Sequence, residues 1–115
     1  MTHAVVRLCA TCAPQTASDA RAALQDALDA AGLPATVMAQ ACFNACAAPV
    51  SLSLQAQGFA TYFFAGVDPM AHRDDIVATV ELYLSSPQGW IEDARPCGQL
   101  RLCLSGRVPA LAEIP

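Results

Sequence analysis

The chain has 115 residues, a net charge of −4 and an apolar fraction of 55%, with six cysteines and no lysine. This length suits one domain around one hydrophobic core. The acidic balance argues against nucleic-acid binding, and no apolar run approaches the roughly 20 residues of a membrane span. The N-terminus lacks the pattern of a secretory signal, so we expect a cytoplasmic protein, whose thiols serve more often as metal ligands or catalysts than in disulfides.

The first elements in chain order are a strand and an amphipathic helix. The short run Ala4–Leu8 contains β-branched residues and leads directly into Cys9-Ala-Thr-Cys12. From Ser18 to Ala31, apolar residues recur at spacings of three and four, which predicts a helix with one buried face. Gly32 and Pro34 follow, where a helix stop is expected.

Three further strands and a second helix are expected beyond this point. Residues 35–40 read as a strand, and the strand-helix-strand order makes it a parallel neighbour of the first. Residues 50–55 and 59–64 form a plausible hairpin. Asp68-Pro69 is a typical helix start, and an apolar stripe follows it between Ile76 and Leu84.

The order β-α-β-β-β-α predicts an α/β protein of thioredoxin-like fold, with helices packed on a mixed sheet. We assign residues 1–86 to a thioredoxin-like metal- or cluster-binding domain. Residues 87–115 are expected to form a C-terminal extension packed on the same domain, with one strand-like stretch at Gln99–Leu104.

Two pairs of cysteines follow the two strands that are expected to run parallel. Cys9 and Cys12 come after the first strand, and Cys42 and Cys46 come after its neighbour. Parallel strands lie about 4.8 Å apart and end at the same edge of a sheet, so the four thiolates are expected to converge. A Cys₄ set can hold either a tetrahedral zinc ion or a [2Fe–2S] cluster.

The spacing of the second pair favours the cluster. Structural zinc sites usually combine two tight C-x₂-C turns, and only Cys9 and Cys12 have that spacing. Three residues separate Cys42 from Cys46, which suits a wider cluster whose sulfides need backbone N–H donors. We therefore predict a one-electron carrier rather than an enzyme. The acidic chain favours a redox partner protein with a basic docking face.

The chain also resembles known families. Its cysteine pattern resembles that of the thioredoxin-like [2Fe–2S] ferredoxins, although their first pair is usually spaced more widely. The chain looks like the DUF1636 family of predicted metal-binding proteins over nearly its whole length. These resemblances imply a ferredoxin-like fold, a Cys₄ site at the four cysteines named above and a homodimer. The segments that carry the DUF1636 resemblance are Cys9-Ala-Thr-Cys12, Ala41-Cys-Phe-Asn-Ala-Cys46, Gly58-Phe-Ala-Thr-Tyr62, Ser86-Pro-Gln-Gly-Trp90 and Arg107-Val-Pro109.

Alternatives to an electron carrier stay open. A Cys₄ site could bind zinc or cobalt in a metal-handling protein, which the DUF1636 resemblance links to cobalamin synthesis. Cys9 and Cys12 could form a dithiol oxidoreductase, but such a motif usually opens a helix, and here the helix is expected only from Ser18. Cys97 and Cys103 are expected not to be ligands, although they could pair with each other or substitute in a site.

Overall fold

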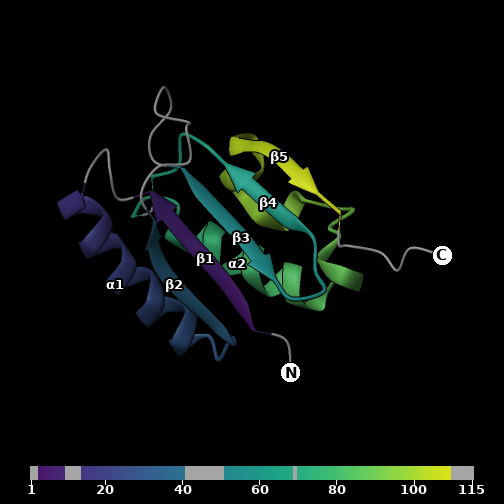
Figure 1. Cartoon of the computed structure of the whole chain (residues 1–115), viewed down its shortest axis with the longest axis horizontal. Helices are drawn as coiled ribbons and strands as arrows, with labels where there is room; N and C mark the ends of the chain where they lie inside the picture. Colours follow the sequence, from purple (N-terminus) through teal and green to yellow (C-terminus); the bar gives the residue numbers. More distant parts are fainter. Residues whose placement is uncertain (1–2, 10–13, 41–50, 69, 110–115) are drawn as a thin grey trace.

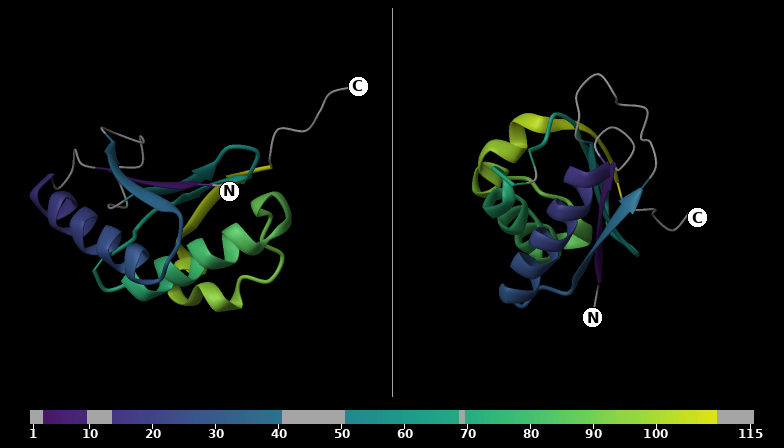
Figure 2. Two further views of the ribbon diagram at one scale, coloured as in Figure 1. Left: turned by 90° about the horizontal axis from the view of Figure 1, so that it is seen from below. Right: turned by 90° about the vertical axis from the view of Figure 1, so that its left-hand side faces the viewer.

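The structure is a computed structural model that describes residues 3–9, 14–40, 51–68 and 70–109. These residues form one mixed β-sheet, and the helices pack on one of its two faces (Figures 1 and 2). None of the helices in the described ranges is long and apolar enough to cross a membrane.

Five strands make up the sheet, in the order β2-β1-β3-β4-β5. β1 and β2 pair in parallel, and the other three neighbouring pairs are antiparallel. This arrangement confirms the predicted thioredoxin-like α/β fold, and β5 extends its sheet at one edge. The strands are β1 (Ala4–Cys9), β2 (Ala35–Gln40), β3 (Leu52–Ala56), β4 (Thr61–Phe64) and β5 (Leu104–Val108).

The first helix is longer than the sequence pattern indicates. Helix α1 spans Pro14–Ala30, so it begins four residues before the predicted start at Ser18. Proline is well suited to the first turn of a helix, because its fixed φ is helical and its missing N–H would have no partner there. Helix α2 (Arg73–Ser85) also differs from its expected start, since the Asp68 carboxylate caps a turn that precedes the helix.

The chain after α2 corrects a second expectation. Residues Gln99–Leu104 were expected to be a strand, yet most of them belong to a 3₁₀ helix, η2 (Arg95–Cys103), and the strand starts only at Leu104. Gly98 has non-helical dihedral angles (φ 61°, ψ −131°), so η2 consists of two short turns with a kink between them, and its buried side chains, Cys97 and Leu100, lie on either side of that kink. A shorter 3₁₀ helix, η1 (Pro87–Gly89), connects α2 to this region.

The hydrophobic core lies between the sheet and the two α-helices. Alternate residues of β1, such as Val6 and Leu8, are fully buried and face the helices. Helix α1 contributes Leu24 and Leu28, and α2 contributes residues such as Ile76. This one-sided core follows from the alternation of strand side chains and the single apolar stripe on each helix.

Helix α1 is also tied to the sheet by one polar side chain. Gln25 Nε2 donates to the carbonyl oxygen of Ala35 at 3.0 Å, and the backbone N–H of Val37 donates to Gln25 Oε1 at 2.8 Å. Both partners belong to β2, the strand at the edge of the sheet. The glutamine side chain therefore provides hydrogen-bond partners for two backbone groups at the edge of the sheet, and it holds α1 in position against β2.

The end of the sheet where β3 turns into β4 is packed with aromatic side chains, and we call it the aromatic end. The rings of Phe59 and Tyr62 meet the ring of Tyr83 edge-on, at centroid distances of 5.3 and 5.8 Å. The Tyr62 hydroxyl donates to Gly89 O at 3.0 Å and accepts from the N–H of Ile91 at 2.8 Å. Burial of the Tyr83 hydroxyl raises its pKa well above the usual range.

Candidate metal centre

The opposite end of the sheet is where the first cysteine pair begins, and we call it the cysteine end. β1 stops at Cys9, whose register partner on the parallel strand β2 is Gln40, the last residue of that strand. The two strands therefore stop side by side. The segments that continue from them leave the sheet at the same end.

β3 begins at the cysteine end as well, on the other side of β1. Its first residue, Leu52, pairs with Leu8 of β1. The chain that joins β2 to β3 is therefore anchored on both sides of β1, at points two strand spacings apart, about 10 Å. The backbone of Cys9 lies between these anchors because β1 is the middle strand of the three.

The lengths of the connecting segments limit how far the other cysteines can lie from this end. Cys12 is three residues from Cys9, and Cys42 is two residues from Gln40. A fully extended chain spans at most about 3.6 Å per residue. Cys12 can therefore lie at most about 11 Å from Cys9, and Cys42 at most about 7 Å from Gln40. Cys12, Cys42, Cys46 and the side chain of Cys9 lie outside the described residues, and their role as ligands stays a prediction.

Both α-helices begin at the cysteine end. α1 follows β1 through the segment that contains Cys12, and α2 follows β4, which runs parallel to β1 because each is antiparallel to β3. A helix N-terminus carries a partial positive charge of about half an elementary charge, which favours a nearby anion. The N-terminus of α1 therefore favours thiolates in the segment before it, whereas that of α2 already has the carboxylates of Asp74 and Asp75 in its first turn.

Local hydrogen bonds shape the chain just before α2. Backbone N–H groups of Met70 and Ala71 both donate to Asp68 Oδ1 at 3.1 Å. These bonds lower the pKa of the Asp68 carboxyl below its ordinary value, and the bond from Ala71 has the larger effect. Asp75, in the first turn of α2, accepts the backbone N–H of Gln99 at 3.0 Å and so joins α2 to η2.

The two remaining cysteines are free thiols. Cys97 is only 3% exposed and belongs to η2. Cys103 lies at the cysteine end, because Leu104 pairs with Phe64, but β3 and β4 separate its strand from β1, a distance of about 14 Å. Burial raises the pKa of the Cys103 thiol. That neither cysteine is a ligand of the expected centre stays a prediction.

Histidines and carboxylates add no metal-binding candidate in the part of the chain that the structure describes. No group of three or more His, Cys, Asp or Glu side chains there is arranged to hold a metal ion.

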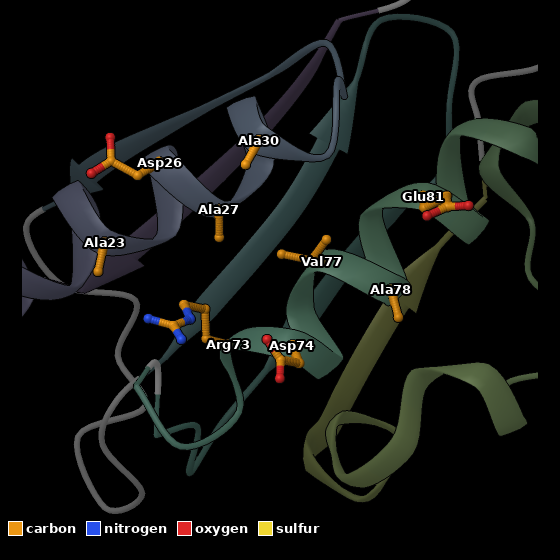
Figure 3. A pocket seen from close by; sticks show the side chains of 9 residues that line it. All are labelled: Ala23, Asp26, Ala27, Ala30, Arg73, Asp74, Val77, Ala78 and Glu81. Atoms are coloured by element: carbon orange, nitrogen blue, oxygen red, sulfur yellow. The ribbon is translucent and has the colours of Figure 1, made fainter.

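A further feature was missed by the sequence interpretation, an open groove between α1 and α2 with a volume of about 690 Å³ (Figure 3). We call it the helix groove. The side chains of Ala27 and Val77 point toward one another across it, and charged side chains of both helices stand around it. The sequence carries a partial signal, because alanines recur on one face of α1. The apolar lining consists of Ala23, Ala27, Ala30, Val77 and Ala78.

Comparison with known proteins gives one match. A family model with the description "Protein of unknown function (DUF1636)" matches residues 6–110 of the chain. No curated protein and no solved structure matches the chain.

Proposed function

The chain belongs to the DUF1636 family, and for it we propose the function of a one-electron carrier that holds a [2Fe–2S] cluster on Cys9, Cys12, Cys42 and Cys46. The family match extends over all four cysteines. When bound, such a cluster supplies a one-electron couple between its oxidised and reduced states. We propose a carrier without an enzymatic activity of its own.

The observation that carries this proposal is the paired ending of β1 and β2. Cys9 and Gln40 are register partners on parallel strands, so the segments with the two cysteine pairs start from neighbouring points. Cys12 and Cys42 are both within a short reach of these points, as derived above. Four thiolates that converged at this end would need a metal or cluster to balance their charge.

Electrostatics support an anionic centre at this end. Two ferric ions, two sulfides and four thiolates sum to about −2, and reduction makes the sum about −3. The N-terminus of α1 has no acidic residue in its first turn and favours negative charge in the segment that precedes it. Backbone N–H groups near the sulfurs and burial of the cluster would set its reduction potential.

The charge of the carrier also suggests the nature of its redox partner. The chain has a net charge of −4, and reduction of the cluster would add one negative charge. A basic docking face on the partner would attract both states and favour the reduced one. We place the carrier in the cytoplasm, where thiols stay reduced, and we retain the homodimer that the ferredoxin resemblance implies.

A second candidate function is a dithiol oxidoreductase. The sequence argument against it was a late start of the first helix, and that argument is wrong, since α1 begins at Pro14, two residues after Cys12. A C-x-x-C motif that opens a helix has the first thiol near the positive end of the helix dipole, which lowers its pKa. The presence of a second cysteine pair still makes the Cys₄ centre our first choice.

Metal and sulfide analysis of anaerobically purified protein separates the candidates. The proposal expects about two irons and two acid-labile sulfides per chain, visible absorption, and an electron paramagnetic resonance signal after one-electron reduction. A colourless protein with one zinc or cobalt and no sulfide would replace the electron carrier by a metal-handling protein. A metal-free protein that reduces disulfides would establish the dithiol function.

Single cysteine variants test the ligand set. Cys46→Ser is expected to lower cluster content strongly, because serine is a poor ligand for this cluster. Cys103→Ser is the matched control, since it removes a half-buried thiol at the same end of the sheet and should leave cluster content unchanged. Equal iron and sulfide in Cys46→Ser and the unmodified protein would remove Cys46 from the ligand set.

A further inference from the structure

We propose that the helix groove between α1 and α2 is a docking site for a basic amphipathic helix of a partner protein. The proposal concerns residues of α1 and α2 alone, all of them within the described ranges. It is independent of the metal or cluster that the cysteines hold. Three properties of the groove support it: its apolar lining, its charged rim and its length.

The lining of the groove consists of small side chains. Alanines 23, 27 and 30 of α1 face Val77 and Ala78 of α2, and none of these five is fully buried (Figure 3). Small side chains allow the backbone of an incoming helix to approach closely, at the 8–10 Å axis separation of packed helices. The partly exposed apolar surface would be covered by such a helix, which is a favourable change.

Charged side chains at the rim determine which helix fits. Asp26, Asp74 and Glu81 contribute three carboxylates, and Arg73 contributes one cation, so the rim has a surplus of two negative charges. All four side chains are exposed. Among the described residues, Arg73 forms no ion pair with these carboxylates. A helix with lysine or arginine beside its apolar stripe would complement this rim.

The dimensions also suit a helix. The lining residues of α1 extend from Ala23 to Ala30 and those of α2 from Arg73 to Glu81. At 1.5 Å per residue these spans are about 10–12 Å, which corresponds to about two helical turns. The groove is open rather than enclosed, unlike the pockets that bind small molecules.

Other occupants fit less well. A second copy of the chain carries the same negative charge, and self-docking would bring like charges together. An anionic membrane surface would be repelled for the same reason. An added strand would need exposed backbone groups, but the backbone groups of α1 and α2 are paired within the helices except at their ends.

Fluorescence anisotropy with the full chain tests the proposal. The probe is a labelled helical peptide of about eleven residues, or three turns, with alanine and leucine on one face and arginine on both flanks. We expect saturable binding that weakens as salt is added. A second peptide with glutamate in place of each arginine should not bind. Equal binding of the two peptides, or no binding of the basic one, would overturn the proposal.

Variants of the rim show whether the peptide binds in the groove. In a double variant, Asp26→Lys and Glu81→Lys, the basic peptide should bind about tenfold more weakly, because two attractions become repulsions. Glu92→Lys is the matched control, since it reverses an exposed carboxylate outside the groove. The proposal is wrong if Glu92→Lys weakens binding as much as the double variant does.

A change in the lining tests the apolar contact separately. Ala27→Phe fills the middle of the groove without altering its charge, and it should abolish peptide binding. Amide resonances of Ala23, Ala27 and Val77 in the unmodified chain should shift when the basic peptide is added. Shifts confined to another surface would place the peptide elsewhere and refute the assignment. Circular dichroism confirms that each variant remains folded.

Discussion

The two ends of the sheet differ in what their side chains do. At the aromatic end, the hydroxyl of Tyr62 bonds to the backbone on both sides, and its ring and that of Phe59 pack against Tyr83. At the cysteine end, the parallel strands β1 and β2 stop side by side and two helices start, and the segments that follow these two strands are rich in cysteine. The core runs along the whole sheet, but side-chain hydrogen bonds and ring contacts fix the aromatic end, whereas the cysteine end is where we propose the metal centre.

The largest effect is expected from Tyr83→Ala. This side chain is fully buried and contacts two other aromatic rings. Removing it leaves a cavity and should lower the free energy of unfolding by about 3–5 kcal/mol, measured by chemical denaturation. Phe63→Ala is the control. Phe63 is 39% exposed, so its replacement should lower the free energy of unfolding much less. If the ends are separate, the metal content per folded chain stays unchanged, and a proportional loss of metal would contradict the comparison.

Gly89→Ala is expected to have the next largest effect. Gly89 has φ +69°, and an added Cβ would lie 2.6 Å from Tyr83 Cε1 and 2.8 Å from Phe59 Cδ2. We expect the free energy of unfolding, measured by thermal or chemical denaturation, to fall by about 2–3 kcal/mol. Gly32→Ala is the matched control, since Gly32 has φ +70° but no atom within 4 Å of the added Cβ. Equal costs at the two positions would mean that packing at the aromatic end is not tight.

Tyr62→Phe tests the hydrogen bonds of the aromatic end while its ring remains. The variant leaves the carbonyl of Gly89 and the N–H of Ile91 without their buried partner. The expected loss is about 1–2 kcal/mol in denaturant unfolding. A variant as stable as the unmodified chain would show that the ring alone holds this end together.

Asp68→Asn gives the smallest expected effect, and it concerns pH. The folded pKa of Asp68 is lowered by the N–H groups of Ala71 and Met70, so its stabilisation is present above the ordinary carboxyl pKa and is lost as pH falls through the folded value. When the pH is lowered from neutral to about 3, the free energy of unfolding should therefore fall less in the variant than in the unmodified chain. Identical pH dependence would exclude this contribution.

Sequence periodicity was sufficient for the first four strands and for the order of the fold, because strand alternation and helix stripes are local, but it misassigned Gln99–Leu104. It was insufficient where a contact with a residue distant in sequence determines the position of a side chain. Gln25 is a polar residue of an amphipathic helix, for which solvent exposure is the simplest expectation, yet it binds the backbone of β2. The face that α1 turns toward α2, and hence the helix groove, is likewise set by packing of whole elements.

The cysteine end shows the same limit in another form. The spacing of the two pairs and the parallel strands could be derived from sequence, and the register of Cys9 with Gln40 agrees with that derivation. The early start of α1 could not, because Pro14 is compatible both with a loop and with a first helical turn. Because α1 begins at Pro14, the C-x-x-C motif of Cys9 and Cys12 lies shortly before a helix, which keeps the dithiol function as a candidate.

The link between Gln25 and β2 has a consequence for assembly. β2 is an outer strand, and unpaired outer strands are templates onto which another chain can add. Here the carbonyl of Ala35 and the N–H of Val37 are already occupied by the amide of Gln25. A second copy could pair with these two groups only by displacing the side chain of Gln25. This part of β2 is therefore a poorer template for extension of the sheet than an outer strand whose backbone groups are free.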